Sequence, residues 1–361
     1  MSTVTFVTRK FPPSVGGMQT LAADVWQTLV SGTDTDARLV AHGGPNRALP
    51  AFLVRAAVTT ARAARRGEVG VVLTGDVLMY LVLRPLSRVF RFRLATMAMG
   101  KDVVWRWRPY QWLVRRGLPR AELVLAISAA TAAAVVAAGV PADRVEVVRL
   151  GIEVPEPTSE QDAVRRELQE RLGVEPGTVV IATLGRLVRR KGAAWFVREV
   201  LPRLPARCVY VVAGEGDERT ALLEARAALE DPQRVRLLGS VDDADRELLM
   251  RGCDIFAQPN IRVDGDMEGF GLVAVEAAVR GALVVASDLE GLRDAVVDGL
   301  TGVLVPTRDA DAWVRTLTGL VDGGELASLA ADYARACRAR YDREDMGARL
   351  RDLLVRSSRR A

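Results

Sequence analysis

Cysteine and histidine are scarce in this chain of 361 residues, which has three cysteines and one histidine. Cys208, Cys253 and Cys337 are widely spaced and odd in number, so they indicate neither a disulfide framework nor a zinc site. A Ser-His-Asp triad or a histidine-based metal centre would depend on His42 alone, and we interpret His42 as a structural residue. These residues therefore indicate no cysteine- or histidine-based metal site.

Long apolar runs are also missing. The best candidate for a membrane span, residues 69–86, contains Asp76 and Arg84 and falls short of the ~20 apolar residues that a span needs. The first residues lack the basic region, apolar region and cleavage site of a signal peptide. A composition of 49% hydrophobic and 26% charged residues is globular, and the length suits two domains. We expect a cytoplasmic two-domain protein.

Lysine is rare, with three residues against 47 arginines, and the positive charge is unevenly spread. Residues 1–150 hold 20 Lys and Arg against 9 Asp and Glu, whereas residues 151–361 hold 30 against 36. Residues 84–120, the basic block, contain ten basic residues and one acid, Asp102. Such a block attracts phosphate, nucleic acid or an acidic membrane face. The alternative is the solvated surface of an arginine-rich chain.

The basic block also contains the aromatic residues Trp105, Trp107, Tyr110 and Trp112. Interleaved aromatic and basic residues suit peripheral contact with the anionic inner face of a membrane, or a phosphorylated or lipid acceptor. They also suit stacking on sugar rings or bases. A buried helix with tryptophan in the core is the alternative. Because no recognisable nucleic-acid motif accompanies them, we expect no nucleic-acid partner.

Apolar runs of strand length alternate with amphipathic stretches of helix length along both halves. Strands are predicted at residues 4–8, 37–41, 69–73, 93–97, 123–127 and 145–148, and again at 179–183, 207–213, 235–238, 255–258, 283–286 and 302–305. Helices are predicted at residues 18–29, 51–65, 77–90, 110–116 and 129–138, then at 193–201, 218–229, 244–251, 271–279 and 309–320, with a mostly helical tail from 324 to 360. This alternation predicts an α/β protein with two doubly wound parallel sheets.

A polar stretch with Pro155 and Pro157 separates the two halves, as a linker would. We place an N-terminal Rossmann-like domain at residues 1–153 and a second at residues 154–342. Two such domains in succession create a deep cleft, and ligands of these folds sit at the carboxyl ends of the strands.

Two glycine-containing loops follow predicted strands and precede helices. In the loop of residues 11–19, Gly16 and Gly17 would let backbone N–H groups approach an anion, although such a turn is as often only a turn. In the loop of residues 185–192, Arg186 offers a planar fork of donors and Lys191 a compact cation. The second loop predicts a diphosphate site, with a solvated basic turn as the alternative.

Two further segments carry polar candidates. Glu268 and Glu276 lie eight residues apart, and Glu276 falls on an otherwise apolar helix, where a ribose diol would satisfy its carboxylate. The alternative is a surface glutamate on a half-exposed helix. In the loop after the fourth strand, Lys101 and Asp102 are the polar candidates and are expected to face the cleft.

Taken together, these segments resemble a known family. The loops of residues 11–19 and 185–192, the turn at 214–217 and the Glu268-x7-Glu276 motif are similar to the retaining GT-B glycosyltransferases of family GT4. Within that family the chain resembles actinobacterial mannosyltransferases of the phosphatidylinositol mannoside type, and residues 262–271 are similar to the donor loop of that subgroup. The resemblance implies a hexosyltransferase that needs no metal and no cofactor besides its nucleotide-sugar substrate. Its donor would be a GDP- or UDP-sugar held by the second domain, and its acceptor a small molecule, a lipid-linked molecule or a glycan. The final helix, residues 343–361, would cross back to the first domain.

The resemblance also implies roles for single residues, most of them in donor binding. Gly16 and Gly17 would meet the donor phosphate; Arg186 and Lys191 would neutralise the diphosphate leaving group; Gly214 and Val241 would lie near the nucleotide; Glu276 would hold the ribose; and Glu268 with Gly269, Phe270, Gly271 and Leu272 would hold the donor sugar.

One position departs from the family pattern. Members commonly carry His-Gly-x-Asp/Glu where this chain has Met99, Gly100, Lys101 and Asp102. We expect Met99, Lys101 and Asp102 on the acceptor side, with Asp102 counted among the catalytic residues beside Glu268. Methionine can neither donate the hydrogen bond of an imidazole nor take a proton. A noncatalytic sugar-nucleotide-binding protein is therefore the alternative to an active transferase.

Overall fold

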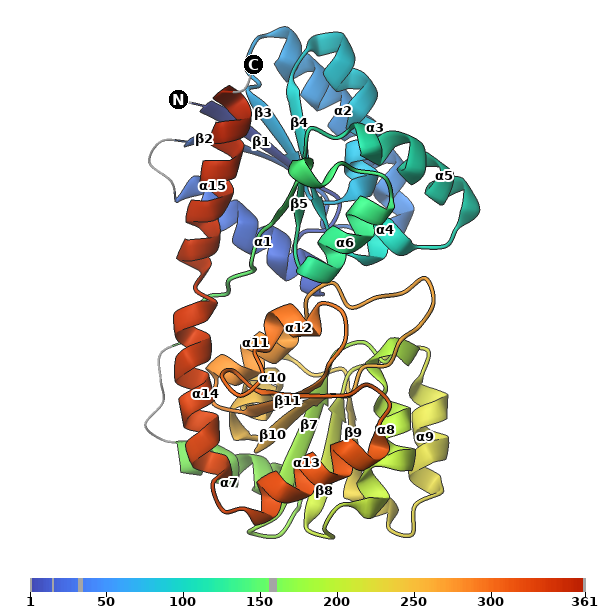
Figure 1. Cartoon of the computed structure of the whole chain (residues 1–361), viewed down its shortest axis with the longest axis vertical. Coiled ribbons are helices and arrows are strands. Elements are labelled where there is room, and N and C mark those ends of the chain that lie inside the picture. The colour runs from blue at the N-terminus through green and yellow to red at the C-terminus, as the bar shows by residue number, and fades with distance from the viewer. Residues whose placement is uncertain (1, 15, 32–34, 156–160, 360–361) are drawn as a thin grey trace. The chain divides into compact units, whose positions relative to one another are not determined.

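A computed structural model describes residues 2–14, 16–31, 35–155 and 161–359 of the chain (Figure 1). By its internal contacts the chain divides into two compact units. The N-terminal unit comprises residues 1–153, 265–270 and 341–361, and the C-terminal unit comprises residues 154–264 and 271–340. The short segment 265–270 thus groups with the N-terminal unit, although the sequence analysis placed it in the second domain.

The N-terminal unit is built on a six-stranded parallel sheet in the order β2-β1-β3-β4-β5-β6. Its strands are β1 Ser2–Thr8, β2 Thr35–Ala41, β3 Val71–Thr74, β4 Arg93–Ala98, β5 Leu123–Ala126 and β6 Val145–Val147. Its helices are α1 Gly17–Val30, α2 Leu49–Arg65, α3 Val77–Phe90, α4 Lys101–Val104, α5 Arg108–Gly117, α6 Ala129–Ala137 and α15 Arg343–Arg359.

The C-terminal unit has a second six-stranded parallel sheet, in the order β12-β11-β10-β7-β8-β9. Its strands are β7 Val179–Leu184, β8 Cys208–Ala213, β9 Val235–Gly239, β10 Ile255–Gln258, β11 Leu283–Ser287 and β12 Val303–Val305. Its helices are α7 Gln161–Leu172, α8 Ala193–Glu199, α9 Arg219–Ala227, α10 Asp243–Gly252, α11 Leu272–Val279, α12 Leu292–Ala295, α13 Ala310–Asp322 and α14 Leu326–Arg340.

Buried apolar side chains explain why these strands form sheet interiors. Strands β8 and β11 are buried along their whole length, as expected for parallel strands with helices on both faces. In the C-terminal unit the ring of Phe196 packs on Tyr210 at 4.5 Å and edge-on against Trp313 at 5.8 Å. These three aromatic side chains from α8, β8 and α13 join the helices to the sheet.

Helix α15 packs against α1 of the N-terminal unit (Figure 1). Arg343 Nη1 lies 3.4 Å from Asp24 Oδ1 of α1 and 3.0 Å from Glu153 Oε2. The N–H of Ile152 donates to the carbonyl of Tyr341, and a β-bridge joins Ile152 to Asp342. The end of the chain is therefore tied to the N-terminal unit by backbone hydrogen bonds as well as by ion pairs.

All twelve predicted strands are present, and each end agrees with the prediction within two residues. The predicted doubly wound α/β fold is confirmed. Three helices were not predicted: α4 and α12 have four residues each, and α7 is a highly polar helix that follows the proline stretch. Hydrophobic periodicity carries no information over four residues, which explains the first two omissions.

Candidate functional site

In each parallel sheet, successive strands are added first toward one edge and then toward the other, and the order reverses at one point between two neighbouring strands. In the C-terminal unit this point lies between β7 and β10, because β8 and β9 extend the sheet on one side and β11 and β12 on the other. In open α/β sheets, ligands bind beyond the carboxyl ends of the two strands at such a point. The loops that begin at Gly185 and after Gln258 are therefore the expected place for a ligand.

Lys191 stands at this point of the C-terminal unit. Its Nζ lies 3.1 Å from Oε1 of Gln258, the last residue of β10, and the side chain is buried. Arg186, in the same loop, is exposed. The structure therefore places one cation of the predicted diphosphate loop on a fixed partner and leaves the other extended into solvent.

The neighbouring turn holds the loop of residues 185–192 in place. The N–H of Leu187 donates to the carbonyl of Glu215 at 2.9 Å, and the carbonyl of Leu187 accepts from Glu218 N–H at 3.0 Å. A Cβ atom on Gly214 would lie 1.9 Å from the carbonyl oxygen of Gly185, so only glycine permits this approach. The loop is thus braced by the end of β8 rather than being an independent turn.

Glu276 lies on α11 with its carboxylate mostly buried. Its Oε2 atom is 2.7 Å from Nη2 of Arg246 on α10, and the two side chains are 13% and 31% exposed. The sequence left open which group satisfies this carboxylate, and Arg246 is a partner within the protein itself. A carboxylate can accept about four hydrogen bonds, so a ribose diol could still share it.

A second ion pair lies beside the first one. Glu247 pairs with Arg280 Nε at 2.7 Å and with Arg251 Nε at 2.6 Å, and Arg280 Nη1 also donates to the carbonyl of Glu276. Hydrogen bonds from the two arginines lower the pKa of Glu247 against the effect of its burial, which is the largest single influence. The Glu276–Arg246 pair joins α11 to α10, and the Glu247–Arg280 pair joins α10 to the residue that follows α11.

Helix α10 follows the predicted base-contact residue directly. Val241 is half-buried and precedes Asp242, whose side chain caps α10 by accepting from Asp245 N–H at 2.8 Å. Gly271 and Leu272 begin α11, and Gly271 is buried. All three predicted residues therefore lie beside helix starts in the C-terminal unit.

The rest of the predicted sugar-binding motif lies in segment 265–270 of the N-terminal unit. A Cβ atom on Gly269 would lie 2.3 Å from the carbonyl oxygen of Met99, and Thr131 Oγ1 donates to the Gly269 carbonyl at 3.4 Å. Lys101 Nζ lies 3.1 Å from Asp266 Oδ1. These contacts explain why segment 265–270 groups with the N-terminal unit.

Two other residues of the segment are partly or fully buried. Glu268 is half-buried, and Phe270 is buried with its ring edge-on to Tyr341 at 6.1 Å. Phe270 therefore acts as a core residue of the N-terminal unit, and a contact of its side chain with a sugar stays a prediction.

Asp102 has a structural role that the sequence did not reveal. Its Oδ2 atom accepts from Val77 N–H at 3.0 Å and its Oδ1 atom accepts from Met99 N–H at 2.8 Å, and the side chain is buried. Tyr110 donates its hydroxyl proton to the Asp102 carbonyl at 2.6 Å. Both carboxylate oxygens therefore accept hydrogen bonds from backbone N–H groups. A direct part of Asp102 in catalysis stays a prediction.

A second buried carboxylate lies near Asp102. Asp76 forms an ion pair with Arg9, whose Nε is 2.7 Å from Asp76 Oδ2, and its other oxygen caps α3 at Met79 N–H. Burial, followed by the charge of Asp76, raises the pKa of Asp102 to about 6. The two aspartates meet where β1 and β3 lie adjacent, which is the point of reversal in the N-terminal sheet.

One expectation for the loop after β4 needs correction. Met99 was expected on the acceptor side, but its side chain is buried, with 7% of its surface exposed. Lys101 pairs with Asp266 while 49% of its side chain stays exposed, so its place on the acceptor side stays a prediction. The backbone carbonyl of Met99 and the side chain of Lys101 both lie next to segment 265–270, about 165 residues further along the chain, and hydrophobic patterning cannot reveal such a contact.

Three further residues singled out in the sequence, Gly16, Gly17 and His42, also lie in the N-terminal unit. Gly16 has a φ of 147° and precedes α1, whereas Gly17 is the exposed first residue of that helix, and a Cβ atom there would meet no atom within 4 Å. His42 stacks on Phe52 at 5.1 Å, as a structural residue would.

The described residues contain neither a metal-ligand cluster nor a membrane-spanning helix. No group of three or more histidine, cysteine or acidic side chains is arranged to hold a metal ion in residues 2–14, 16–31, 35–155 and 161–359. Within the same ranges, every helix is too short or too polar to cross a membrane.

Comparison with known proteins identifies the family of the domain that holds most of these residues. Residues 178–322, from the start of β7 to the end of α13, match the family model described as "Glycosyl transferases group 1". The chain carries a group 1 glycosyltransferase domain. Arg186, Lys191, Gly214, Val241 and Glu276 all lie inside this domain.

Relatives with assigned functions support the same family. The D-inositol 3-phosphate glycosyltransferase of Xylanimonas cellulosilytica is 34% identical over 230 residues, which are 62% of this chain and 54% of that protein. The phosphatidyl-myo-inositol mannosyltransferase of Mycolicibacterium smegmatis is 38% identical over 159 residues, 43% of this chain and 38% of that protein. The chain thus spans about half the length, or less, of the curated relatives that it matches.

Solved structures show the fold over the whole chain. Anabaena HepE in complex with UDP superposes with a TM-score of 0.80 at 21% identity, covering 99% of this chain and 100% of that one. The catalytic domain of Arabidopsis thaliana starch synthase IV, bound to ADP and acarbose, has a TM-score of 0.78 at 12% identity and covers 99% of each chain. The two sheets therefore match the two Rossmann-like domains of GT-B glycosyltransferases.

Proposed function

We propose that this group 1 glycosyltransferase moves a hexose from a nucleotide-diphosphate sugar, with GDP or UDP as the nucleotide, to an acceptor hydroxyl. The observation that carries this proposal is the loop of residues 185–192, which brings Arg186 and Lys191 to the reversal point of the C-terminal sheet. The UDP bound to Anabaena HepE, a protein of the same fold, is consistent with a nucleotide ligand.

The chemistry of transfer requires stabilisation of a leaving anion. When the bond between the anomeric carbon and the β-phosphate oxygen breaks, the nucleoside diphosphate departs with added negative charge. Cations fixed in advance lower the energy of this transition state more than that of the bound donor. Lys191 is held in place by Gln258, and the exposed Arg186 offers a fork that can grip two oxygens. In this proposal the two residues supply the positive charge beside the leaving diphosphate without a metal ion.

The ribose and the acceptor are handled by other groups. Glu276 accepts hydrogen bonds from the ribose diol while keeping its pair with Arg246. Because Met99 cannot take a proton, the leaving phosphate oxygen accepts the proton of the acceptor hydroxyl as the new glycosidic bond forms. In this proposal both events occur on one face of the sugar, so the anomeric configuration is retained.

The test starts with donor binding. The melting temperature of the wild type is measured with GDP, UDP, ADP and their hexose conjugates, because a true ligand stabilises the folded state by mass action. The best donor is then used for turnover with and without EDTA, and the product anomer is determined by NMR. A melting temperature that no nucleotide or nucleotide sugar changes would exclude the donor site, an inverted product would exclude retention, and a need for divalent ions would exclude the metal-free chemistry.

The buried Met99 favours one alternative, a sugar-nucleotide-binding protein without transferase activity. Its side chain replaces the imidazole that related enzymes commonly carry, and it is enclosed by protein. A wild type that binds a nucleotide sugar tightly, yet neither hydrolyses nor transfers it with any acceptor alcohol offered, would support this alternative.

A further inference from the structure

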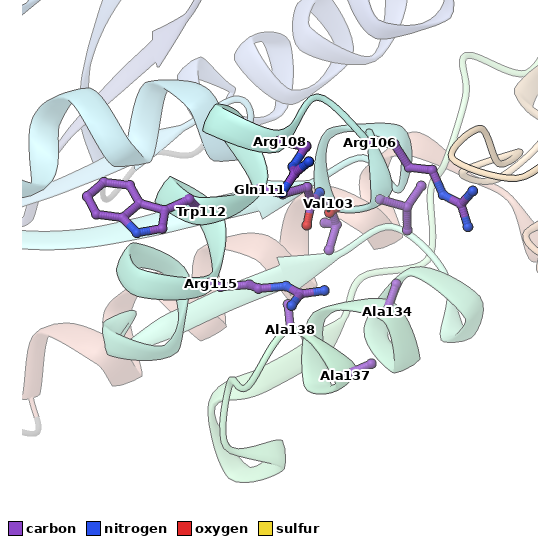
Figure 2. Close-up of a pocket in the computed structure, with 10 residues that line it drawn as sticks. Val103, Arg106, Arg108, Gln111, Trp112, Arg115, Ala134, Ala137 and Ala138 are labelled. Atoms are coloured by element: carbon purple, nitrogen blue, oxygen red, sulfur yellow. Dashed lines mark hydrogen bonds between the residues drawn. The ribbon is translucent and has the colours of Figure 1, made fainter.

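A pocket of about 690 Å³ lies among helices α4, α5 and α6 of the N-terminal unit (Figure 2). Its polar lining residues are Arg106, Arg108, Gln111 and Arg115, with Trp112 beside them. None of the residues assigned above to donor binding or to the acceptor side lines the pocket, although Lys101 and Asp102 share α4 with the lining residues Val103 and Val104. The proposed transfer reaction gives this pocket no role.

The pocket has one apolar wall and one basic wall. The alanines at positions 134, 137 and 138 belong to the end of α6, whereas Arg108 and Arg115 come from α5. Figure 2 shows Arg115 extending from α5 above Ala138. The side-chain amide of Gln111 donates to the carbonyls of Val103 and Trp105, each at 2.8 Å, which fixes α5 against α4.

The basic wall carries charge that the protein does not neutralise. Its lining contains no acidic residue, and the one acid of the basic block, Asp102, is buried with both oxygens on backbone N–H groups. Within the part of the chain that the structure describes, neither Arg108 nor Arg115 has a carboxylate within salt-bridge distance.

Some arginines elsewhere on the surface have acidic partners. Arg203 lies 2.6 Å from Asp311 Oδ1, and Arg207 lies 2.6 Å from Asp322 Oδ1. These exposed arginines have acidic partners in the C-terminal unit. Arg108 and Arg115, by contrast, lie together in the lining of one pocket and have no acidic partner among the described residues.

We propose that this pocket is a binding site for a phosphate ester. Arg108 and Arg115 bind the anionic oxygens, because guanidinium groups match phosphate geometry with two parallel hydrogen bonds. The alanine wall contacts the organic part of the ligand. Arg116, stacked over the Trp112 ring at 4.8 Å, adds positive charge at the rim.

The same phosphate chemistry has two sources. One is the headgroup of an anionic phospholipid, in which case the exposed Trp105, Trp107 and Trp112 lie at the bilayer interface. The other is a soluble phosphorylated molecule, which needs no bilayer.

The test compares two double variants with the same loss of charge. R108Q/R115Q alters the pocket, and R62Q/R66Q removes two exposed arginines of the same unit at the end of α2. Both are made in the full chain carrying K191A, which removes one of the two cations of the proposed donor loop; Arg186 is common to the parent and both variants, so its contribution to the binding of the probe, inorganic pyrophosphate, cancels in the comparison. Pyrophosphate affinity is measured by titration calorimetry. Vesicles of phosphatidylcholine mixed with phosphatidylglycerol, and of phosphatidylcholine alone, are tested by co-sedimentation.

We expect R62Q/R66Q to bind pyrophosphate like its K191A parent and R108Q/R115Q to bind about tenfold more weakly or worse, because two charge-assisted contacts are lost. Binding of the parent to anionic vesicles, lost in R108Q/R115Q and at high salt, identifies the lipid headgroup as the source. Pyrophosphate binding without vesicle binding identifies a soluble phosphate ester.

Equal affinities of the two double variants, or no binding of the parent to either probe, would overturn the proposal. Circular dichroism establishes that all variants are folded. The proposed glycosyl transfer is unaffected by either result, since its own test uses the unmodified donor loop.

Discussion

The reversal points of the two sheets have the same topology and opposite chemistry. In the C-terminal unit, Lys191 is held at the end of β10 by the neutral amide of Gln258. In the N-terminal unit, the corresponding space contains Arg9 paired with Asp76, and Asp102 lies next to them. At one point a lysine contacts a side-chain amide, and at the other point buried carboxylates accept hydrogen bonds from backbone N–H groups and pair with an arginine.

This difference shows that position after a parallel strand does not by itself make a residue functional. Asp102 and Lys191 each follow a strand and stand at or beside a reversal point, yet Asp102 joins α3 and the loop after β4 through two backbone N–H groups. A polar residue in such a loop acts on a ligand only where its hydrogen-bonding atoms remain available. The comparison therefore predicts that a Lys191 variant loses donor turnover, whereas an Asp102 variant loses stability.

The largest effect is expected for Lys191→Ala. Loss of one charged group that stabilises the leaving diphosphate lowers kcat/KM for the donor by about 2–4 kcal/mol of transition-state stabilisation. Arg186→Ala should fall in the same range. Steady-state kinetics measure both, and Arg189→Ala, an exposed arginine of the same loop, is the control that should stay near the wild type. Wild-type turnover in both the Lys191 and Arg186 variants would refute the diphosphate assignment.

Asp102→Ala should instead damage stability. The variant leaves the N–H groups of Val77 and Met99 buried without their acceptor, which lowers the free energy of unfolding by about 2–4 kcal/mol. Chemical denaturation measures the change, with the exposed Asp143→Ala as control. Unchanged stability combined with lost transfer would show that Asp102 is catalytic, as the sequence analysis first suggested.

The raised pKa of Asp102 gives a third test of the difference between the two reversal points, through the pH dependence of stability. Because this pKa is about 6 in the folded protein, above the ordinary aspartate value of 3.8, the folded state binds the proton more strongly between these pH values. The free energy of unfolding therefore decreases as pH rises from about 4 to 6, by up to about 3 kcal/mol from this group.

Asp102→Asn removes this titration. The stability of the wild type minus that of Asp102→Asn should fall across the same pH interval and be flat above about pH 7, as measured by urea unfolding at each pH. A difference that is constant across the whole interval would mean that Asp102 titrates normally.

Sequence patterning found the sheets because each strand is a local apolar run, but it could not find contacts between distant residues. The partners Lys191 and Gln258 lie 67 positions apart, and Asp102 and Val77 lie 25 apart. The alternation of strands and helices and the glycines of the loops located Lys191 and Asp102 in the sequence. Their partners, Gln258 and Val77, are known only from the fold. Segment 265–270 was misplaced for the same reason, since its sequence neighbours belong to the C-terminal unit.

A smaller effect is expected at Glu276. Glu276→Gln keeps the size of the side chain but removes its charge, so donor binding should weaken by about 1–2 kcal/mol, seen as a higher donor KM with little change in kcat. Glu247→Gln is the matched control, because Glu247 sits in the adjacent ion pair with Arg280 and Arg251. Equal effects of the two substitutions would assign Glu276 to the packing of α10 against α11 rather than to the ribose.

The smallest effect on stability, and one of opposite sign, is expected for Gly17→Ala. Unlike Gly16, whose φ of 147° suits glycine, Gly17 is the first residue of α1 and has open space where a Cβ would stand. Alanine favours helix over glycine, so the free energy of unfolding should rise by up to about 1 kcal/mol. If Gly17 N–H approaches the donor phosphate, as the family resemblance implies, the same variant should bind donor less well, because the added methyl group obstructs that approach. Denaturation and donor titration of one purified variant measure both quantities. Higher stability with weaker donor binding would show that glycine at this position serves the ligand, whereas higher stability with unchanged binding would remove Gly17 from the site and leave donor recognition to the C-terminal unit.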